Sequence, residues 1–432
     1  MTELVAETRL GDLARAFHTG ERDPLAFLGQ LRERFSAVEP SVRAFVDGTV
    51  DWERIERDLE AQANRASDRA ARPPLYGIPV GVKDIFHVEG FPTQAGSDVP
   101  AEALDGPQGS AVTALERAGA VVLGKTITAE FAYFDPGPTR NPHATGHTPG
   151  GSSSGSAAAV AAGLCPLALG TQTIGSVNRP AAFCGIVGVK PSYGRAPADG
   201  VLPAAPSVDT VGYFTQDVGG ACLAAGVLYD DWRAGDEPPE LETVGVVDGP
   251  YLAGATEEGR TQFRSHVDRL DDAGLDTRRV ELFPEIGTVN ERHERLVAAE
   301  MAPSHGDLSL TYGDRYAKET RTLIEEGRDV SVGALCDAQA GRGELRRAIH
   351  DRMGAHDLDV VVSPAAPGPA PEGIDSTGDP VMNLPWTHAG VPTVTVPASE
   401  TDGLPVGLQC AARFGDDEWL LAWCRRIRTA LD

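Results

Sequence analysis

Two turns rich in glycine and serine, joined by an alanine-rich segment and an apolar run, constrain this chain more than any other feature. The first turn, GGSSSGS at residues 150–156, leads directly into AAAVAA, and the second, Gly175-Ser176, follows the apolar run and precedes Arg179-Pro180. A flexible linker would lack such ordered neighbours. A Gly-Ser turn at a helix start places hydroxyls where backbone N–H groups and the positive end of the helix dipole converge, which favours negative charge developing on oxygen.

The order of periodic segments predicts an α/β protein, a single large domain with a central mixed sheet covered by helices. Residues 1–72 are expected to form an N-terminal helical segment, because apolar side chains recur there at helical spacing. Residues 73–235 are expected to form the catalytic core, because strand-like apolar runs alternate with helical segments. Residues 236–353 are more charged and predict a peripheral lobe, and residues 354–432 return to β-type runs that re-enter the main sheet.

Residues 119–126, Gly119-AVVL-Gly124-Lys125-Thr126, match the pattern of a phosphate-binding P-loop. A P-loop needs a strand before its first glycine and a flexible loop between its glycines. Here residues 110–118 are predicted to be a helix and AVVL is itself predicted to be a strand, so we do not expect nucleotide binding. Further helices are expected at residues 156–162, 257–273 and 290–301, and further strands at residues 165–169 and 241–247.

The composition argues against several classes of function. With 63 acidic and 38 basic residues the net charge is −25, which disfavours nucleic acid as a partner. No run approaches the ~18 apolar residues of a membrane span, and no signal peptide is visible, so a cytoplasmic location is expected. The six scattered cysteines favour neither a zinc site nor a disulfide scaffold. The acidic, lysine-poor composition is typical of a salt-rich cytoplasm, with codon bias as the alternative explanation.

A serine nucleophile needs a general base, and the sequence offers two kinds. None of the ten histidines stands in a Ser/His/Asp motif, but a distant histidine such as His147 stays open as a spatial neighbour. Of the four lysines, Lys83 stands out at the end of the strand-like run PVGV. Considered without the two turns, Lys83 would be interpreted as a surface or ion-paired lysine.

Taken together, the two turns and the run around Lys83 resemble the amidase signature family. The similarity covers most of the chain and weakens between about residues 236 and 353. The resemblance implies a Ser–cis-Ser–Lys triad in which Lys83 is the base, Ser152 follows a cis peptide bond and Ser176 is the acylated nucleophile, with no metal or cofactor. The matching runs are GIPVGVKD at residues 77–84, GGSSSGS at residues 150–156 and GTQTIGSVNRPAAFCG at residues 170–185.

The chemistry that this resemblance implies makes one physical demand on the lysine. Its ordinary pKa is about 10.4, so burial must lower the pKa by about three units, or ~4 kcal/mol, before the amine accepts a proton at neutral pH. Neutral Lys83 would then withdraw a proton through Ser152 from Ser176. The Ser176 oxygen would attack the amide carbonyl, ammonia would leave, and water would hydrolyse the acyl-enzyme.

Two departures from the family pattern lie around the nucleophile. The resemblance implies oxyanion donors in the backbone N–H groups of Thr173, Ile174 and Gly175, but two glycines are usual there, and a β-branched residue restricts φ and would reshape the oxyanion hole. The family's arginine two residues after the nucleophile is Asn178 here, with Arg179 one place later. This arrangement resembles the malonamidase-like branch, whose arginine binds a substrate carboxylate; pairing with a structural acid is the other role open to Arg179.

The sequence therefore predicts an amidase that hydrolyses a small carboxamide to carboxylate and ammonia, with a preference for carboxylate-bearing amides. The alternative is the glutamine-hydrolysing A component of a tRNA-dependent amidotransferase, which would work with a partner protein. An inactive scaffold is disfavoured by the intact triad. The expected ligand is a small-molecule amide, with no direct nucleic-acid partner and no membrane partner, and a homodimer is left open.

Overall fold

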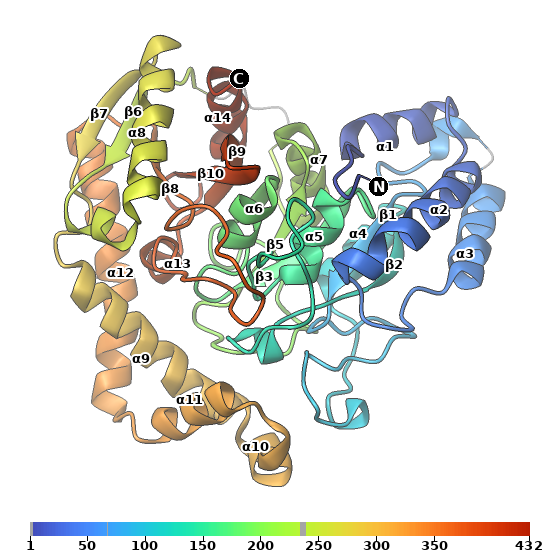
Figure 1. The fold of residues 1–432 in the computed structure, drawn as a ribbon, viewed down its shortest axis with the longest axis horizontal. Coiled ribbons are helices and arrows are strands. Elements are labelled where there is room, and N and C mark those ends of the chain that lie inside the picture. Colours follow the sequence, from blue (N-terminus) through green and yellow to red (C-terminus); the bar gives the residue numbers. More distant parts are fainter. Residues whose placement is uncertain (1–2, 67, 234–238) are drawn as a thin grey trace.

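Ten strands of the described residues, 3–66, 68–233 and 239–432, form one sheet in the computed structural model (Figure 1). The expected boundary between residues 235 and 236 lies outside the described residues. The strand order is β2-β1-β3-β5-β4-β9-β10-β8-β6-β7. The strands are β1 Pro79–Lys83, β2 Val121–Thr126, β3 Leu167–Gln172, β4 Val187–Lys190, β5 Thr210–Thr215, β6 Thr243–Val247, β7 Asp276–Val280, β8 Val360–Pro364, β9 Thr393–Thr401 and β10 Leu404–Ala411.

Pairing in the sheet is parallel at both ends and antiparallel in the middle. β1 pairs in parallel with β2 and β3, and β6 pairs in parallel with β7 and β8. The strands between these groups pair antiparallel. The α/β class and the central mixed sheet are thereby confirmed. The more charged segment contributes β6 and β7 to this same sheet, and the division of the chain into four segments stays a prediction.

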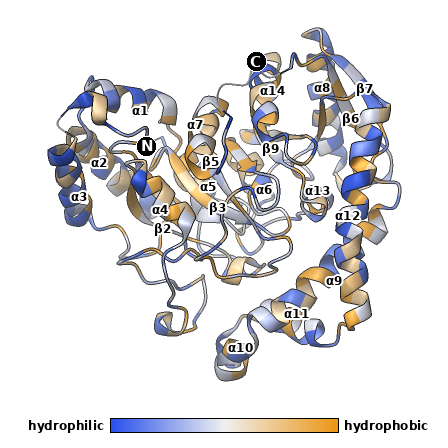
Figure 2. Ribbon diagram, turned by 180° about the vertical axis from the view of Figure 1, so that it is seen from behind, coloured by the Kyte–Doolittle hydropathy of each residue, from blue (hydrophilic) through white to orange (hydrophobic). Residues whose placement is uncertain are grey.

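Helices cover the sheet, and the more deeply buried helices contain more apolar residues. α5 is alanine-rich and buried along its whole length, since small side chains let it pack closely on the strands. Figure 2 shows hydrophobic residues concentrated in α5 and α7, and mostly hydrophilic residues on α3. The helices are α1 Leu10–Thr19, α2 Pro24–Val42, α3 Trp52–Arg65, α4 Ser110–Arg117, α5 Ser154–Ala161, α6 Asn178–Cys184, α7 Val218–Leu228, α8 Glu257–Asp272, α9 Ile286–Ser304, α10 Gly306–Tyr312, α11 Lys318–Arg328, α12 Val332–Ala355, α13 Leu384–Ala389 and α14 Asp417–Ala430.

The segment with the P-loop pattern is a helix, a turn and a strand. α4 precedes Gly119, whose φ of 92° suits a glycine after a helix end. Both Gly124 and Lys125 lie within β2 and are buried. The backbone between the two glycines is therefore a strand and does not form a phosphate-binding loop.

Helices α9, α10 and α11 form an arm that extends from the sheet (Figure 1). The arm is fastened to the rest of the fold at the loop after β2. The buried carboxylate of Glu130 accepts hydrogen bonds from the Ala317 N–H and the Thr320 hydroxyl. The ring of Phe131 stacks on Tyr316 with ring centroids 4.8 Å apart. These contacts hold the arm against the part of the fold that carries the candidate site.

Candidate active site

The candidate site lies where the carboxyl ends of β1 and β3 meet the two glycine- and serine-rich turns. Lys83 is the last residue of β1 and Gln172 is the last residue of β3. Because these strands pair in parallel, both ends lie at the same edge of the sheet, where ligand sites of α/β proteins form. The first turn leads into α5 and the second, with Ser176, leads into α6.

Lys83 is fully buried and contacts one of the two candidate serines. Its Nζ donates hydrogen bonds to Ser152 Oγ at 2.9 Å and to Thr171 Oγ1 at 2.8 Å. The peptide bond between Gly151 and Ser152 is cis. Burial lowers the pKa of Lys83 to about 7, while the nearby carboxylate of Asp209 opposes that shift. The lysine thus has the neutral form available that proton transfer near pH 7 requires.

Ser176 lies in the second turn, and the residues on both sides of this turn contact the first. The Ser153 hydroxyl bonds to the backbone of Thr171, and a Cβ on Gly150 would come within 2.7 Å of Pro180 Cα. Ser176 keeps 7% of its surface exposed. In the part of the chain that the structure describes, no hydrogen bond joins the Ser176 hydroxyl to Ser152 or to any other residue.

His147, the other candidate base, lies elsewhere. It forms an isolated β-bridge with Glu372 and accepts a backbone hydrogen bond from Asn141. No hydrogen bond among the described residues joins its ring to either serine. The structure therefore joins Lys83, and not His147, to a serine of the first turn.

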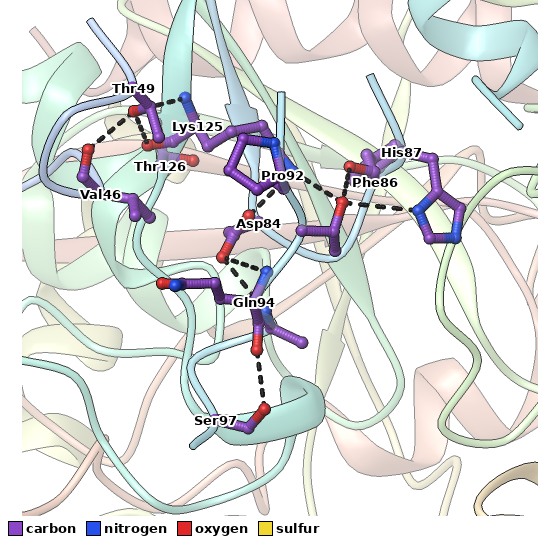
Figure 3. A network of polar contacts seen from close by, with 12 residues as sticks. Val46, Thr49, Asp84, Phe86, His87, Pro92, Gln94, Ser97, Lys125 and Thr126 are labelled. Atoms are coloured by element: carbon purple, nitrogen blue, oxygen red, sulfur yellow. Dashed lines mark hydrogen bonds and ion pairs between the residues drawn. The ribbon is translucent and has the colours of Figure 1, made fainter. Parts of the chain in front are cut away.

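An ion pair beside Lys83 fixes the end of β1 (Figure 3). Lys125 Nζ lies 2.8 Å from Asp84 Oδ1, and both side chains are buried. The other oxygen of Asp84 accepts the Gln94 N–H, and Lys125 also donates to the Thr93 hydroxyl. Burial raises the pKa of Asp84 and lowers the pKa of Lys125. The residue that directly follows Lys83 is thus held from two sides.

Gln172 organises the backbone around the candidate nucleophile. Its Oε1 accepts the N–H groups of Val177 and Asn178 at 2.8 and 2.9 Å. Its Nε2 donates to Thr387 Oγ1 of α13 at 3.0 Å. The side chain therefore closes the loop that contains Ser176 and ties it to a helix more than 200 residues later in the chain.

The backbone of the expected oxyanion loop explains why isoleucine is accepted before its glycine. Neither Ile174 nor Gly175 has a positive φ, so conformation does not require a second glycine. Gly175 is needed for a different reason, because a Cβ there would lie 2.5 Å from Asn383 Oδ1. The β-branched residue therefore does not force a left-handed backbone on this loop.

A cavity of about 270 Å³ opens beside the strand ends. The Thr173 hydroxyl donates to Asp209 Oδ1 at 2.6 Å, and burial raises the pKa of Asp209. Most of the remaining lining is apolar. The lining residues include Ile85, Ala132, Thr171, Val201, Leu202 and Val211.

Arg179 is buried, with 2% of its surface exposed, and only part of its guanidinium is bonded. Its Nη2 donates to the Gly151 carbonyl at 2.7 Å and to Thr377 Oγ1 at 3.0 Å. Nε and Nη1 have no partner, and no ion pair to Arg179 forms within the described residues. Burial lowers its pKa to about 9, against the attraction of Asp379. By contrast, the side chain of Asn178 bonds to two threonines of β9.

Several contact residues were not singled out from the sequence. Thr171 and Gln172 stand inside the run that carries the family resemblance, where polar side chains end an apolar strand, so a signal was present. Asp209 and Thr387 stand far away in sequence, and no local pattern marks them.

No helix within residues 3–66, 68–233 and 239–432 is long and apolar enough to cross a membrane. In these same ranges, no three His, Cys, Asp or Glu side chains gather as a group able to hold a metal ion.

The family match and the named structural neighbours indicate an amide C–N hydrolase. The chain belongs to the amidase family, since the family model named Amidase matches residues 27–421. Among solved structures it resembles the crystal structure of an amidase, with a TM-score of 0.88 and 31% identity over 98% of this chain and 100% of that chain. It also resembles the peptide amidase from Stenotrophomonas maltophilia, with a TM-score of 0.82 and 26% identity over 98% and 97% of the two chains.

Curated relatives carry a more specific name, since several are glutamyl-tRNA(Gln) amidotransferase A subunits. The one from Roseiflexus sp. strain RS-1 is 33% identical over 97% of this chain and 95% of that protein. The protein of the same name from Salinibacter ruber is 31% identical over 95% and 97% of the two chains. The family expected from the sequence is confirmed. The malonamidase-like branch stays a prediction.

Proposed function

We propose that this chain hydrolyses the carboxamide of a small substrate to carboxylate and ammonia through an acyl-enzyme on Ser176. The observation that carries this proposal is the contact of the buried Lys83 amine with Ser152, together with a pKa of about 7 for that amine. A fully buried lysine that titrates near neutrality is suited to act as a general base. Its burial lowers the stability of the fold, so packing alone does not account for it.

The reaction begins with proton transfer along three side chains. Neutral Lys83 accepts the Ser152 proton as Ser152 accepts the proton of Ser176, whose oxygen attacks the amide carbon. The hydrogen bond between the two serines forms as substrate binds, since catalytic contacts tighten in the complex. The proton returns through Ser152 to the leaving nitrogen, the C–N bond breaks, and ammonia departs. Water then attacks the ester by the same route and releases the carboxylate.

Backbone donors would stabilise the negative charge on the carbonyl oxygen. The N–H groups of Thr173, Ile174 and Gly175 precede the nucleophile and form no hydrogen bond among the described residues. Donors that are fixed in a water-poor site before the reaction begins stabilise a developing oxyanion strongly.

We further propose that the substrate bears a carboxylate that binds Arg179. Its unpartnered Nε and Nη1 are buried, and a buried donor without a partner costs about 1–3 kcal/mol. A carboxylate would balance the buried charge and would accept a hydrogen bond from Nη1 or from Nε. Because Nη2 holds the carbonyl of Gly151, such a carboxylate would lie close to Ser152.

Glutamine is a specific candidate within this substrate class. It carries both a carboxamide and a carboxylate, and the curated relatives quoted above are amidotransferase A subunits. In that second candidate function the chain would release ammonia from glutamine together with a partner protein. Recovery of a stable partner at fixed stoichiometry on purification from native cells would favour this function over a free-standing amidase.

The proposal is tested by measuring ammonia released from succinamate, glutamine and the neutral amide butyramide. We expect turnover of at least one carboxylate-bearing amide and loss of that turnover in Ser176→Ala, which retains the fold. Wild-type turnover by purified Ser176→Ala would exclude Ser176 as the nucleophile.

The carboxylate preference has its own test. Arg179→Ala should lower kcat/KM for succinamate by roughly 30-fold or more, on the scale of a desolvated charged hydrogen bond, and change butyramide much less. Arg179→Lys should recover only part of the loss, because an ammonium lacks the planar fork. Equal losses on the two amides would show that Arg179 acts only in the structure.

A further inference from the structure

Two successive carbonyl groups of the loop before Ser176 are held by side chains from the far half of the chain. His293 Nε2, on α9, donates to the Thr173 carbonyl at 3.0 Å. Thr387 Oγ1, on α13, donates to the Ile174 carbonyl at 2.7 Å. Both donors are buried, and α9 packs against α13 behind the loop.

Because the peptide unit is planar, a hydrogen bond to its carbonyl also sets the direction of its N–H on the opposite face of the loop. In a trans peptide the C=O and N–H groups point in opposite directions. A donor on the Thr173 carbonyl therefore fixes the direction of the Ile174 N–H, and a donor on the Ile174 carbonyl fixes the Gly175 N–H. Hydrogen bonding at the carbonyl also polarises the amide, which strengthens its N–H as a donor.

A second buried histidine, His388, contacts the ring of His293. A carbonyl oxygen only accepts, so His293 carries its proton on Nε2 and leaves a lone pair on Nδ1. His388 Nδ1 lies 3.3 Å from this atom and therefore donates to it. Burial lowers the pKa of His293 to about 3 and of His388 to about 2, so both rings are neutral at the pH of the reaction.

We propose that His293 and Thr387 are positioning residues of the oxyanion hole, which aim the Ile174 and Gly175 N–H groups at the substrate oxygen, and that His388 keeps His293 in the required tautomer. This proposal rests on the proposed acylation of Ser176. It predicts that the two side chains affect the transition state much more than substrate binding, since both act through backbone carbonyls of the loop.

The test measures the second-order rate at which a serine-directed alkyl fluorophosphonate labels the protein, because the phosphoryl oxygen occupies the oxyanion hole during attack. Loss of a whole oxyanion donor slows reactions by about 100- to 1,000-fold. His293→Phe leaves the donor present but unaimed, so we expect labelling to slow about 10- to 100-fold. His293→Gln, which restores an N–H, should lie within about fivefold of wild type.

Thr387 provides an independent pair of variants of similar volume. Thr387→Val removes the hydroxyl and should slow labelling about tenfold, whereas Thr387→Ser keeps it and should label nearly as wild type. With an amide substrate, the same losses should appear in kcat while KM stays nearly constant. His266→Phe is the matched control, because His266 is equally buried but bonds to Ser399 on β9, and it should label at the wild-type rate.

The outcomes separate this inference from the proposed function. Labelling of folded His293→Phe and Thr387→Val at the wild-type rate would overturn the positioning role while leaving Ser176 as the nucleophile. A slow His293→Phe that His293→Gln does not rescue, or equal slowing in His266→Phe, would show a packing defect and would likewise overturn it. Absence of labelling in wild type, or undiminished labelling of Ser176→Ala, would remove the proposed nucleophile and the positioning role with it.

Discussion

Replacing Lys83 by methionine should make the protein more stable at neutral pH while abolishing its hydrolysis. The amine is fully buried, and its pKa falls from 10.5 to about 7. At 1.36 kcal/mol per pKa unit, burying this amine lowers the free energy of unfolding by roughly 5 kcal/mol near pH 7. Methionine is of similar length and brings no charge into the interior.

Part of this gain is offset, because two hydroxyls lose their bond to the amine. Ser152 and Thr171 each accept a hydrogen bond from Nζ, and each lost bond costs about 1–2 kcal/mol. We therefore expect the free energy of unfolding of Lys83→Met to exceed that of wild type by roughly 1–3 kcal/mol at pH 7. If methionine would make the fold more stable, stability alone does not explain why this position is a lysine.

The stability difference between Lys83→Met and wild type should depend on pH in a definite direction. Between the folded pKa of about 7 and the unfolded pKa of about 10.5 the unfolded chain binds more protons, so wild-type stability rises with pH across this window. Lys83→Met lacks that rise, so its advantage should be largest at or below pH 7 and vanish or reverse by about pH 10.

Urea unfolding of both proteins from about pH 6 to about pH 10 measures this difference. The exposed Lys318 supplies the control, since Lys318→Met should show no such trend. If the difference in unfolding free energy between Lys83→Met and wild type were constant across the window, the argument from the buried amine would be refuted.

Three further predictions concern catalysis, the ion pair and the surface. Ser152→Ala should retain a small fraction of the wild-type kcat, because Ser176 still attacks without the proton relay; full loss of labelling by fluorophosphonate would contradict this. Asp84→Asn should lower the free energy of unfolding by about 3–5 kcal/mol, and adding Lys125→Met should restore much of the loss in urea titrations, since a buried charge without its partner is the costly state. Finally, the melting temperature should rise from low to molar KCl if the excess of surface carboxylates destabilises by repulsion; a flat or falling profile would favour codon bias.

Local sequence patterns predicted much of the part of the fold that carries the candidate site. The apolar run before Lys83 and the two glycine- and serine-rich turns indicate strand ends and helix starts, and these local signals correspond in the structure to β1, α5 and α6. α5 begins at Ser154, inside the turn that was expected to precede it, because the serines of this turn are themselves helical.

The remaining parts were hidden for physical reasons. β7 reads DTRRV and its residues are mostly partly or fully exposed, so it lacks the apolar pattern that marks a strand. Likewise, Asp209 and His293 reach the site through contacts between distant segments. A buried polar residue is predictable only when its partner is known, since satisfaction of its hydrogen bonds is a property of the fold.

The distribution of contacts also bears on the charged segment after the catalytic core. The three candidate catalytic side chains all precede residue 180, yet the loop before Ser176 is held by His293 of α9 and Thr387 of α13. The same arm reaches the loop after β2 through Glu130. Through His293 this segment would be coupled to the proposed reaction, although none of the three candidate catalytic side chains lies in it. Substitution of its inward-pointing polar side chains should therefore disturb the expected oxyanion loop more than substitutions on its outer surface.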